Sequence, residues 1–347
     1  MDLLKSAEIL IEKIEKDYKE DVAVVVVMGS YIYNETHSRS DLDMYFVPNT
    51  KRGQNLGKVF IIDGIGFDFW PISWERLERI ANHEERTTSI VTEGQIIYYG
   101  SEKDLARFNQ LKAKGLNTKD RKKFIEKAKA QFQKTYQSYF KLLLDQRLSD
   151  ARKHAMEIVF SITYAIALLN GTTIKRGRGK LKKEILNMDL VPKDFSSLYD
   201  TVFISKDIAA IKNSYGELMV NMRNLLEEEE KKEQKILSFK DQLEGYYEEL
   251  INFYNKIHRA CEIEDIYTAL FAAVEINQEI EAAFSGTDVS PETLPDIVGA
   301  FDPDNLEEFL QIVTEHQSRL FNLLKENNVP IQVFNDFIEL KEHIDSL

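Results

Sequence analysis

The hydrophobic and polar positions in the first hundred residues alternate in patterns that predict a small β-sheet. Residues 22–28 form a continuous, mostly β-branched apolar run, VAVVVVM, which is typical of a strand covered on both faces. Residues 58–71 hold two apolar runs that flank Asp63-Gly64, a pair that favours the tight turn of a β-hairpin. Residues 95–99 add one more short apolar run. These runs predict the sheet of an N-terminal domain.

Helical spacing surrounds these strands and then dominates the chain. Residues 2–20 repeat apolar positions at helical intervals, which predicts an amphipathic helix packed on the first strand. Ser73 precedes a second such pattern, and its hydroxyl predicts a helix N-cap there. Beyond residue 105 the expected helices cover residues 120–148, 150–170, 206–257, 261–284, 304–326 and 331–345, with Asn170-Gly171 as a C-cap signature.

A chain of 347 residues is too long for one ordinary core, so more than one domain is expected. We predict an N-terminal α+β domain over residues 1–105, with a mixed sheet and helices, followed by an all-α part. That part divides into a helical domain over residues 106–284 and a linker with a terminal helix pair over residues 285–347. The linker is suggested by three of the seven prolines, which fall in residues 285–304.

Composition narrows the class of protein. A hydrophobic content of 43% with 30% charged residues is typical of a globular chain. There is no charged-then-apolar leader pattern and no apolar run of 18 residues, so we expect neither export nor membrane insertion, and a cytoplasmic location. The single cysteine, Cys261, excludes an internal disulfide and a cysteine-based metal cluster.

The net charge of −13 is unevenly spread along the chain. Residues 1–105 carry a net −7, residues 106–180 carry 18 Lys and Arg against 5 Asp and Glu, and residues 181–347 carry 15 against 34. The basic middle could hold an anionic ligand. The strongly acidic remainder repels a phosphate backbone, which disfavours nucleic acid as a partner.

Candidate chemistry follows the first apolar run directly. Gly29 and Ser30 end the run, and a glycine with a small hydroxyl residue lets the backbone approach a polyphosphate and offers it amide donors. Asp41 and Asp43 begin the next expected strand, where residues two apart share a face. Two carboxylates held so close favour a divalent cation between them, and oxygen ligands beside phosphate favour Mg²⁺.

A third carboxylate comes from the hairpin. Asp68 stands between Phe67 and Phe69 on the returning strand, so alternation directs it away from these aromatic rings. It could share a face with Asp41 and Asp43. The expected metal ligands are therefore Asp41, Asp43 and Asp68.

The ordered set Gly29-Ser30, a ten-residue gap, Asp41-Leu42-Asp43 and a later Asp68 resembles the polymerase-β-like nucleotidyltransferase superfamily. It is similar in particular to the antibiotic nucleotidyltransferases that act on aminoglycosides and lincosamides. The resemblance covers about residues 20–72, and it implies a mixed sheet with helices on one side, two Mg²⁺ ions and nucleotidyl transfer from a nucleoside triphosphate.

One departure from that pattern concerns phosphate binding. Many antibiotic-modifying members carry Arg or Lys a few residues after Gly-Ser, where this chain has Tyr31-Ile32-Tyr33-Asn34. We expect the missing cation to come from Arg39 or from the basic loop 175–180, which contains Lys175, Arg176, Arg178 and Lys180. Glu157 lies in an otherwise apolar helical register, either as the partner of a neighbouring cation or as a base that projects into a cleft between domains.

The resulting hypothesis is an Mg²⁺-dependent transferase that moves a nucleoside monophosphate, AMP from ATP in the first instance, to a hydroxyl of a small acceptor. Asp41 and Asp43 would bridge the two ions, with Asp68 as third ligand or base and Glu157 as second candidate base. The helical domain would hold the acceptor, and the acidity of residues 181–347 favours a cationic one such as an aminoglycoside. The oligomeric state is left open.

Two other classes remain possible from the sequence. One is a nucleotidyltransferase that acts on nucleic acid or protein through the basic stretch. The other is a non-catalytic nucleotide-binding module, antitoxin-like, that partners a helical protein. A kinase is disfavoured because the His-x-Asp-x-x-x-x-Asn pattern of kinases is absent.

Overall fold

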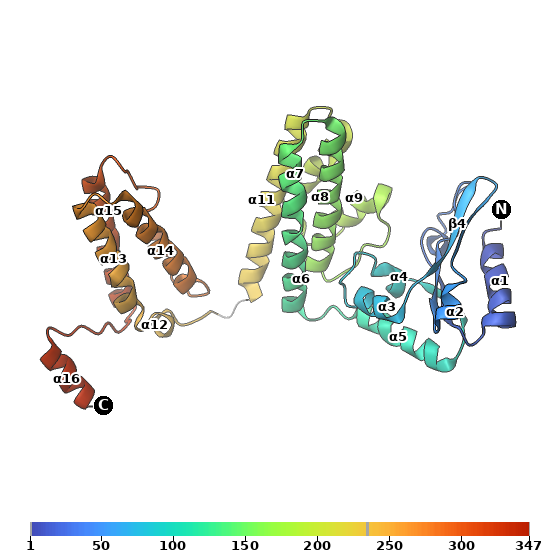
Figure 1. The fold of residues 1–347 in the computed structure, drawn as a ribbon, viewed down its shortest axis with the longest axis horizontal. Coiled ribbons are helices and arrows are strands. Elements are labelled where there is room, and N and C mark those ends of the chain that lie inside the picture. Colours follow the sequence, from blue (N-terminus) through green and yellow to red (C-terminus); the bar gives the residue numbers. More distant parts are fainter. Residues whose placement is uncertain (1, 234–235, 347) are drawn as a thin grey trace. The chain divides into compact units, whose positions relative to one another are not determined.

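The computed structural model describes residues 2–233 and 236–346 of the chain. The chain folds as two compact units, Met1–Glu233 and Gln234–Leu347. The first unit joins a sheet part to a helical bundle, and the second is built from helices (Figure 1). None of the helices in the described ranges combines the length and apolar composition needed to cross a bilayer.

A five-stranded mixed sheet forms the core of the N-terminal part. Its strands are β1 (Val22–Val27), β2 (Met44–Pro48), β3 (Lys58–Ile62), β4 (Ile65–Pro71) and β5 (Gln95–Tyr99). The order across the sheet is β3-β4-β2-β1-β5, with β2 and β4 parallel and the other neighbours antiparallel. The β3–β4 turn is the predicted one, because Asp63 and Gly64 both adopt positive φ, 50° and 76°.

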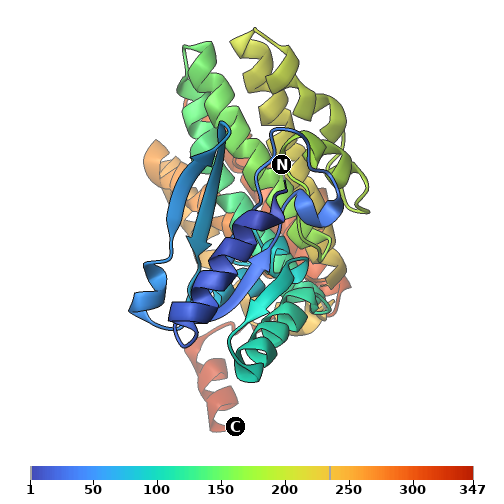
Figure 2. The ribbon, with the colours of Figure 1, turned by 90° about the vertical axis from the view of Figure 1, so that its right-hand side faces the viewer.

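Helices cover both faces of this sheet (Figures 1 and 2). One face carries α1 (Leu4–Lys13) and the following π-turn (Ile14–Tyr18). The other carries α3 (Trp74–Ala81), α4 (Ser89–Thr92) and α5 (Glu102–Leu116). All six residues of β1 are buried, as its continuous apolar run requires. The expectation of helices on one side only is therefore wrong.

The sheet part extends further along the chain than the boundary predicted at residue 105. Phe108 and Leu111 of α5 are buried in the core formed by the sheet with α3 and α4. The α5 helix belongs with the sheet because these side chains complete that core. A short helix, α2 (Lys51–Gln54), lies between β2 and β3 and is capped by Thr50.

The rest of the first unit is a helical bundle with its own core. It contains α6 (Arg121–Gln133), α7 (Thr135–Leu144), α8 (Leu148–Leu169), α9 (Arg178–Leu186), α10 (Phe195–Ile204) and α11 (Ile208–Glu233). The α8 helix ends as predicted, with Asn170 as C-cap and Gly171 at a φ of 59°. A mixed-sheet N-terminal part followed by helices confirms the predicted α+β fold class.

The second unit holds α12 (Phe239–Gln242), α13 (Tyr246–Glu262), α14 (Ile266–Phe284), the 3₁₀ turn Pro291–Thr293, α15 (Leu306–Glu326) and α16 (Phe337–Asp345). The first four of these α-helices share one core, which also includes Ile297 at 1% exposure. The proline-containing segment 285–304 is thus a packed connection and not an interdomain linker. The division falls at 233/234 instead of 284/285. Of the expected helix 206–257, residues 234 and 235 lie outside the described residues.

Candidate functional site

Three carboxylates lie near the point where β2 and β4 begin to pair. Asp41 and Asp43 lie in the segment just before β2, and the backbone N–H of Met28 donates to the Asp43 carbonyl at 2.9 Å, which continues the ladder with β1. The parallel register aligns Tyr45 with Trp70, so two residues earlier Asp43 stands beside Asp68. The three side chains point away from the core that buries Leu42.

The electrostatics of Asp43 show that these carboxylates act on one another. Burial raises the pKa of Asp43, and the charges of Asp41 and Asp68 raise this pKa further. A backbone hydrogen bond from Ser30 and the charge of Arg178 act in the opposite direction. The cluster therefore has a surplus of negative charge that a cation would relieve.

Gly29 lies directly against this cluster. Its φ of 70° is in the left-handed region, and a β-carbon placed on it would stand 2.0 Å from Oδ2 of Asp43. Any other residue at position 29 would displace the carboxylate. The glycine that ends β1 is therefore required by the position of Asp43, and Ser30 follows as a backbone partner of the same carboxylate.

The donor chemistry of the cluster suits magnesium. Carboxylate oxygens are hard ligands, and Mg²⁺ is commonly held by one or two of them together with water and substrate phosphates. Within the described ranges, no group of three or more His, Cys, Asp or Glu side chains is arranged to hold a metal ion. Asp41, Asp43 and Asp68 therefore do not form a preformed three-ligand metal site in the described structure, and an ion there would take one or two of these carboxylates together with water and substrate phosphates.

The basic loop before α9 packs against the segment that follows Ser30. Arg176 forms an ion pair with Glu35 and lies over the ring of Tyr33, 3.7 Å from its centroid. Lys180 also pairs with Glu35. Burial, and then the charge of Glu93, raise the pKa of Tyr33 to about 12. The loop reaches the predicted neighbourhood, although its cations there already have carboxylate partners.

Lys175 also has a carboxylate partner, because its Nζ lies 3.0 Å from a carboxylate oxygen of Glu93. Nη1 of Arg176, in contrast, is buried and has no hydrogen-bond partner among the described residues. Arg176 is therefore the member of the predicted pair that retains capacity for a phosphate oxygen.

Arg178, one of the four cations of the predicted basic loop, is the one whose charge acts on Asp43. It adopts a φ of 39° directly after Gly177, and it makes no ion pair within the described parts of the chain. The signal in the sequence was an arginine between two glycines, Gly177 and Gly179, in a basic loop. Glycine on both sides gives the backbone the freedom that such a conformation needs.

Two predicted residues lie apart from the carboxylates. Arg39 is exposed in a turn, where its backbone N–H donates to Nδ1 of His37 at 3.1 Å. Glu157 accepts a hydrogen bond from the hydroxyl of Ser138 on α7 at 3.0 Å. In the described chain, no hydrogen bond or ion pair joins either side chain to Asp41, Asp43 or Asp68.

A cavity of about 610 Å³ opens in the first unit beside α8, α9 and α10. Its walls combine apolar and aromatic side chains with a few charged ones: Met156, Phe160, Arg178, Gly179, Leu181, Lys182, Tyr199, Asp200 and Phe203. Nζ of Lys182 lies 2.6 Å from Oδ2 of Asp200 in this wall. Because Arg178 both lines the cavity and acts on Asp43, the cavity adjoins the carboxylate cluster.

The acidity that suggested a cationic acceptor is not a property of this cavity. Residues 234–347 carry 7 Lys and Arg against 23 Asp and Glu, whereas residues 181–233 carry 8 against 11. Most of the negative charge therefore belongs to the second unit, and the cavity belongs to the first. Two cations and one carboxylate line it.

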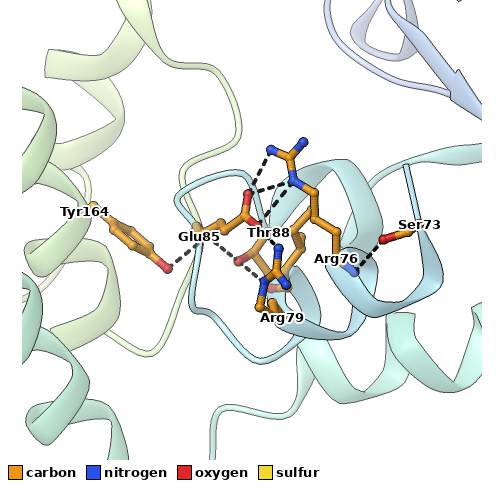
Figure 3. A network of polar contacts seen from close by, with 7 residues as sticks. Ser73, Arg76, Arg79, Glu85, Thr88 and Tyr164 are labelled. Carbon is orange, nitrogen blue, oxygen red and sulfur yellow. Dashed lines mark hydrogen bonds and ion pairs between the residues drawn. The ribbon is translucent and has the colours of Figure 1, made fainter. Parts of the chain in front are cut away.

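A polar network fixes the loop between α3 and α4 to the helical bundle (Figure 3). The backbone carbonyl of Glu85 accepts hydrogen bonds from the hydroxyls of Tyr164 on α8, at 2.9 Å, and of Thr88, at 3.1 Å. The Glu85 carboxylate pairs with Arg76 on α3 at 3.0 Å. Contacts to both structural parts hold this residue, so the backbone of its neighbour Arg86 is also held.

Arg86 is a second cation near the cavity that the sequence did not single out. Its guanidinium lies over the ring of Phe160, 4.3 Å from the centroid. The side chain is half-buried, and burial followed by the charge of Arg178 lowers the pKa of Arg86. The two arginines therefore repel each other within one site.

Many cations of the basic stretch 106–180 have structural partners. Arg121 pairs with Glu229 at 2.6 Å, and Lys129 pairs with Glu230 at 2.5 Å, which ties α6 to α11. Arg107 pairs with Glu78 at 2.8 Å. These charges are neutralised within the fold, which weakens the case for a continuous nucleic-acid surface.

No protein-family model matches the chain, and the search of curated proteins found no match. Among solved structures, a nucleotidyltransferase-like protein from Exiguobacterium sibiricum 255-15 is similar, with 14% sequence identity and a TM-score of 0.36. The match covers 65% of this chain and 77% of that protein. Because identity and TM-score are both low, the function proposed below rests on the residues of this chain.

Proposed function

We propose that this chain is a nucleotidyltransferase that moves a nucleoside monophosphate, AMP from ATP in the first instance, to a hydroxyl of a small acceptor. The observation that carries the proposal is that Asp41, Asp43 and Asp68 lie together near the point where β2 and β4 begin to pair. Gly29 and Ser30 lie against this cluster, and a cavity adjoins it. Clustered carboxylates beside a Gly-Ser turn are suited to polyphosphate chemistry.

Asp41, Asp43 and Asp68 are the residues that would hold Mg²⁺. When bound, Mg²⁺ ions would orient the triphosphate and lower the pKa of the acceptor hydroxyl. The backbone around Gly29 and Ser30 admits the phosphates closely, since position 29 has no side chain. Nη1 of Arg176 is a donor that could reach a phosphate oxygen without losing its ion pair with Glu35.

Asp68 is the preferred base for the acceptor hydroxyl. It is the exposed member of the cluster, on the β4 strand, and so can meet a substrate that approaches from solvent. Glu157 is the weaker candidate because Ser138 already occupies its carboxylate. The proton would pass from the hydroxyl to the Asp68 carboxylate as the new phosphoester bond forms and pyrophosphate leaves.

The cavity is the proposed acceptor site. Its aromatic and apolar walls favour a molecule with an apolar face, and its charged residues favour polar groups at the edge of that face. An aminoglycoside-like antibiotic remains among the acceptors to test. The mostly apolar lining, however, gives a polycation only Asp200 as a carboxylate partner.

The test is incubation of the protein with each radiolabelled nucleoside triphosphate, Mg²⁺ and a panel of hydroxylated compounds. The panel includes aminoglycosides, lincosamides, amphipathic phenols and short RNAs. We expect labelled small-molecule product that disappears in the Asp41→Asn, Asp43→Asn double variant. Label on RNA or on protein, with none on any small molecule, would replace the proposed acceptor class. Nucleotide binding without any transfer would refute the enzyme assignment and favour the non-catalytic nucleotide-binding module, and absence of both would refute the two together.

A further inference from the structure

We infer that Arg86 and Arg178 form an anion-binding pair at the junction of the cavity and the aspartate cluster. The site would take a phosphate-type anion. Its place beside the proposed catalytic carboxylates rests on the function proposed above. The two arginines come from different structural parts, the α3–α4 loop and the N-terminal end of α9.

Phe160 connects the two arginines, because it contacts Arg86 and lines the same cavity as Arg178. The Arg86 guanidinium lies 4.3 Å from the Phe160 ring centroid, and Phe160 and Arg178 line the same cavity. Each arginine carries its charge at any physiological pH. Arg86 is half-buried and Arg178 is exposed, and two cations that act on each other in one site are stabilised by an anion between them.

Neither arginine has a carboxylate partner within the described parts of the chain, whereas Lys175, Arg176 and Lys180 of the same loop all have one. Among the residues that the structure describes, Arg86 contacts one ring, that of Phe160, which supports one face of the guanidinium and leaves its N–H edge available. A planar guanidinium edge is suited to bidentate phosphate binding. The fold has thus neutralised the neighbouring cations and left these two available.

The Arg86 side is held in place before any ligand arrives. The adjacent residue, Glu85, is fixed by hydrogen bonds from Tyr164 and Thr88 and by its ion pair with Arg76 (Figure 3). A preorganised cation loses less conformational entropy on binding than a free one. Arg178 approaches from a loop with glycine on both sides, which allows it to close over the anion.

Two sources could provide the anion. It could be the β- and γ-phosphates of the nucleotide, since Arg178 acts on Asp43. It could also be an acidic group of the acceptor, since Arg178 lines the cavity. In both cases the two guanidinium groups would bind a phosphate-type anion.

Calorimetric titration of inorganic tripolyphosphate into the full chain, in EDTA, tests the pair without turnover. We expect saturable binding that weakens about tenfold or more in Arg86→Gln and in Arg178→Gln, because each removes charge-assisted hydrogen bonds. Arg223→Gln is the matched control, since Arg223 on α11 is exposed, pairs with Glu227 and does not line the cavity, and it should bind as the parent does. Arg86→Lys and Arg178→Lys should lose less affinity than the glutamine variants. Circular dichroism would verify that each variant folds.

Competition then identifies the source. Displacement of tripolyphosphate by a non-hydrolysable ATP analogue assigns the pair to the nucleotide. Displacement by phenyl phosphate, with none by the ATP analogue, assigns it to an anionic acceptor. Both results support the pair. Absence of binding to the parent chain, or equal binding by the parent and both glutamine variants, would overturn it.

The inference and the proposed function can fail separately. Arginine-dependent tripolyphosphate binding in a chain that transfers no nucleotide would leave the anion site standing and remove the enzyme assignment. Nucleotidyl transfer in a chain whose tripolyphosphate affinity is unchanged by either glutamine substitution would leave the enzyme assignment standing and remove the anion site.

Discussion

Gly29 and Asp43 are in such close contact that no side chain can be added between them. A β-carbon on Gly29 would meet three atoms of the Asp43 side chain, at 2.0, 2.7 and 2.8 Å. Gly29, where the turn begins, and Asp43, the second aspartate of the motif, are thus one structural unit, although 14 positions separate them in the sequence. This contact explains why the turn begins with glycine.

Gly29→Ala is therefore expected to abolish nucleotidyl transfer, by about 100-fold or more, because Asp43 must move. The positive φ adds a stability loss of about 1 kcal/mol. The matched control is Gly245→Ala, which has nearly the same φ, 77°, with nothing within 4 Å of the added carbon. Both variants should lose similar stability in urea unfolding, and only Gly29→Ala should lose activity. Equal activity in the two variants would contradict the contact.

Asp43→Asn should abolish transfer and yet stabilise the sheet part in EDTA at pH 7. The pKa of Asp43 is raised by burial, Asp41 and Asp68, so ionisation of Asp43 destabilises the folded state. That destabilisation is absent below the ordinary pKa of 3.8 and complete above the raised pKa. The gain in melting temperature should therefore shrink as the pH is lowered toward 4.

Tryptophan fluorescence is the suitable readout for that experiment, because both tryptophans, Trp70 and Trp74, lie in the sheet part. Asp63→Asn on the hairpin turn is the control, and should leave the melting temperature unchanged. Mg²⁺ should raise the melting temperature of the parent and of Asp63→Asn more than that of Asp43→Asn. An equal Mg²⁺ effect in all three would contradict metal binding at the cluster.

Glu157→Gln should leave the turnover number within about threefold of the parent. Its carboxylate accepts from Ser138 between α7 and α8, and glutamine can still accept that hydrogen bond. In Asp68→Asn, the comparison variant, the turnover number should fall about 100-fold or more, because the substitution removes a base or a metal ligand. A large loss in Glu157→Gln with a shifted pH profile would restore it as the general base.

Tyr164→Phe should weaken tripolyphosphate binding without any direct contact to the anion. It removes the hydrogen bond to the Glu85 carbonyl that holds the Arg86 loop against α8. The expected stability loss is about 1 kcal/mol. Tyr215→Phe is the control, because its buried hydroxyl also donates to a backbone carbonyl, that of Tyr199 at 3.3 Å. Comparable stability losses with equal tripolyphosphate affinity would show that the loop needs no such anchor.

Local sequence patterns predicted much of the secondary structure. The buried β1, the Asp63-Gly64 hairpin and the caps at Ser73 and Asn170 follow from residue type and periodicity, which act over a few neighbours. The boundary at residue 105 could not be read in the same way. An amphipathic helix such as α5 exposes one apolar face in either domain, and only packing shows which core that face completes.

The candidate site divides along the same line. The sequence by itself placed Asp41 and Asp43 on one face, because strand alternation is set by the backbone alone, whereas the parallel register of β2 and β4 decides that Asp68 joins them. It also located a basic loop. Which cation of that loop faces the carboxylates was decided only by tertiary structure. Glu35 and Glu93 neutralise three of its members and leave Arg178, and Arg86 arrives from a separate loop that Tyr164 holds in place. Such pairings join residues 79 to 145 positions apart, and no local spacing encodes them.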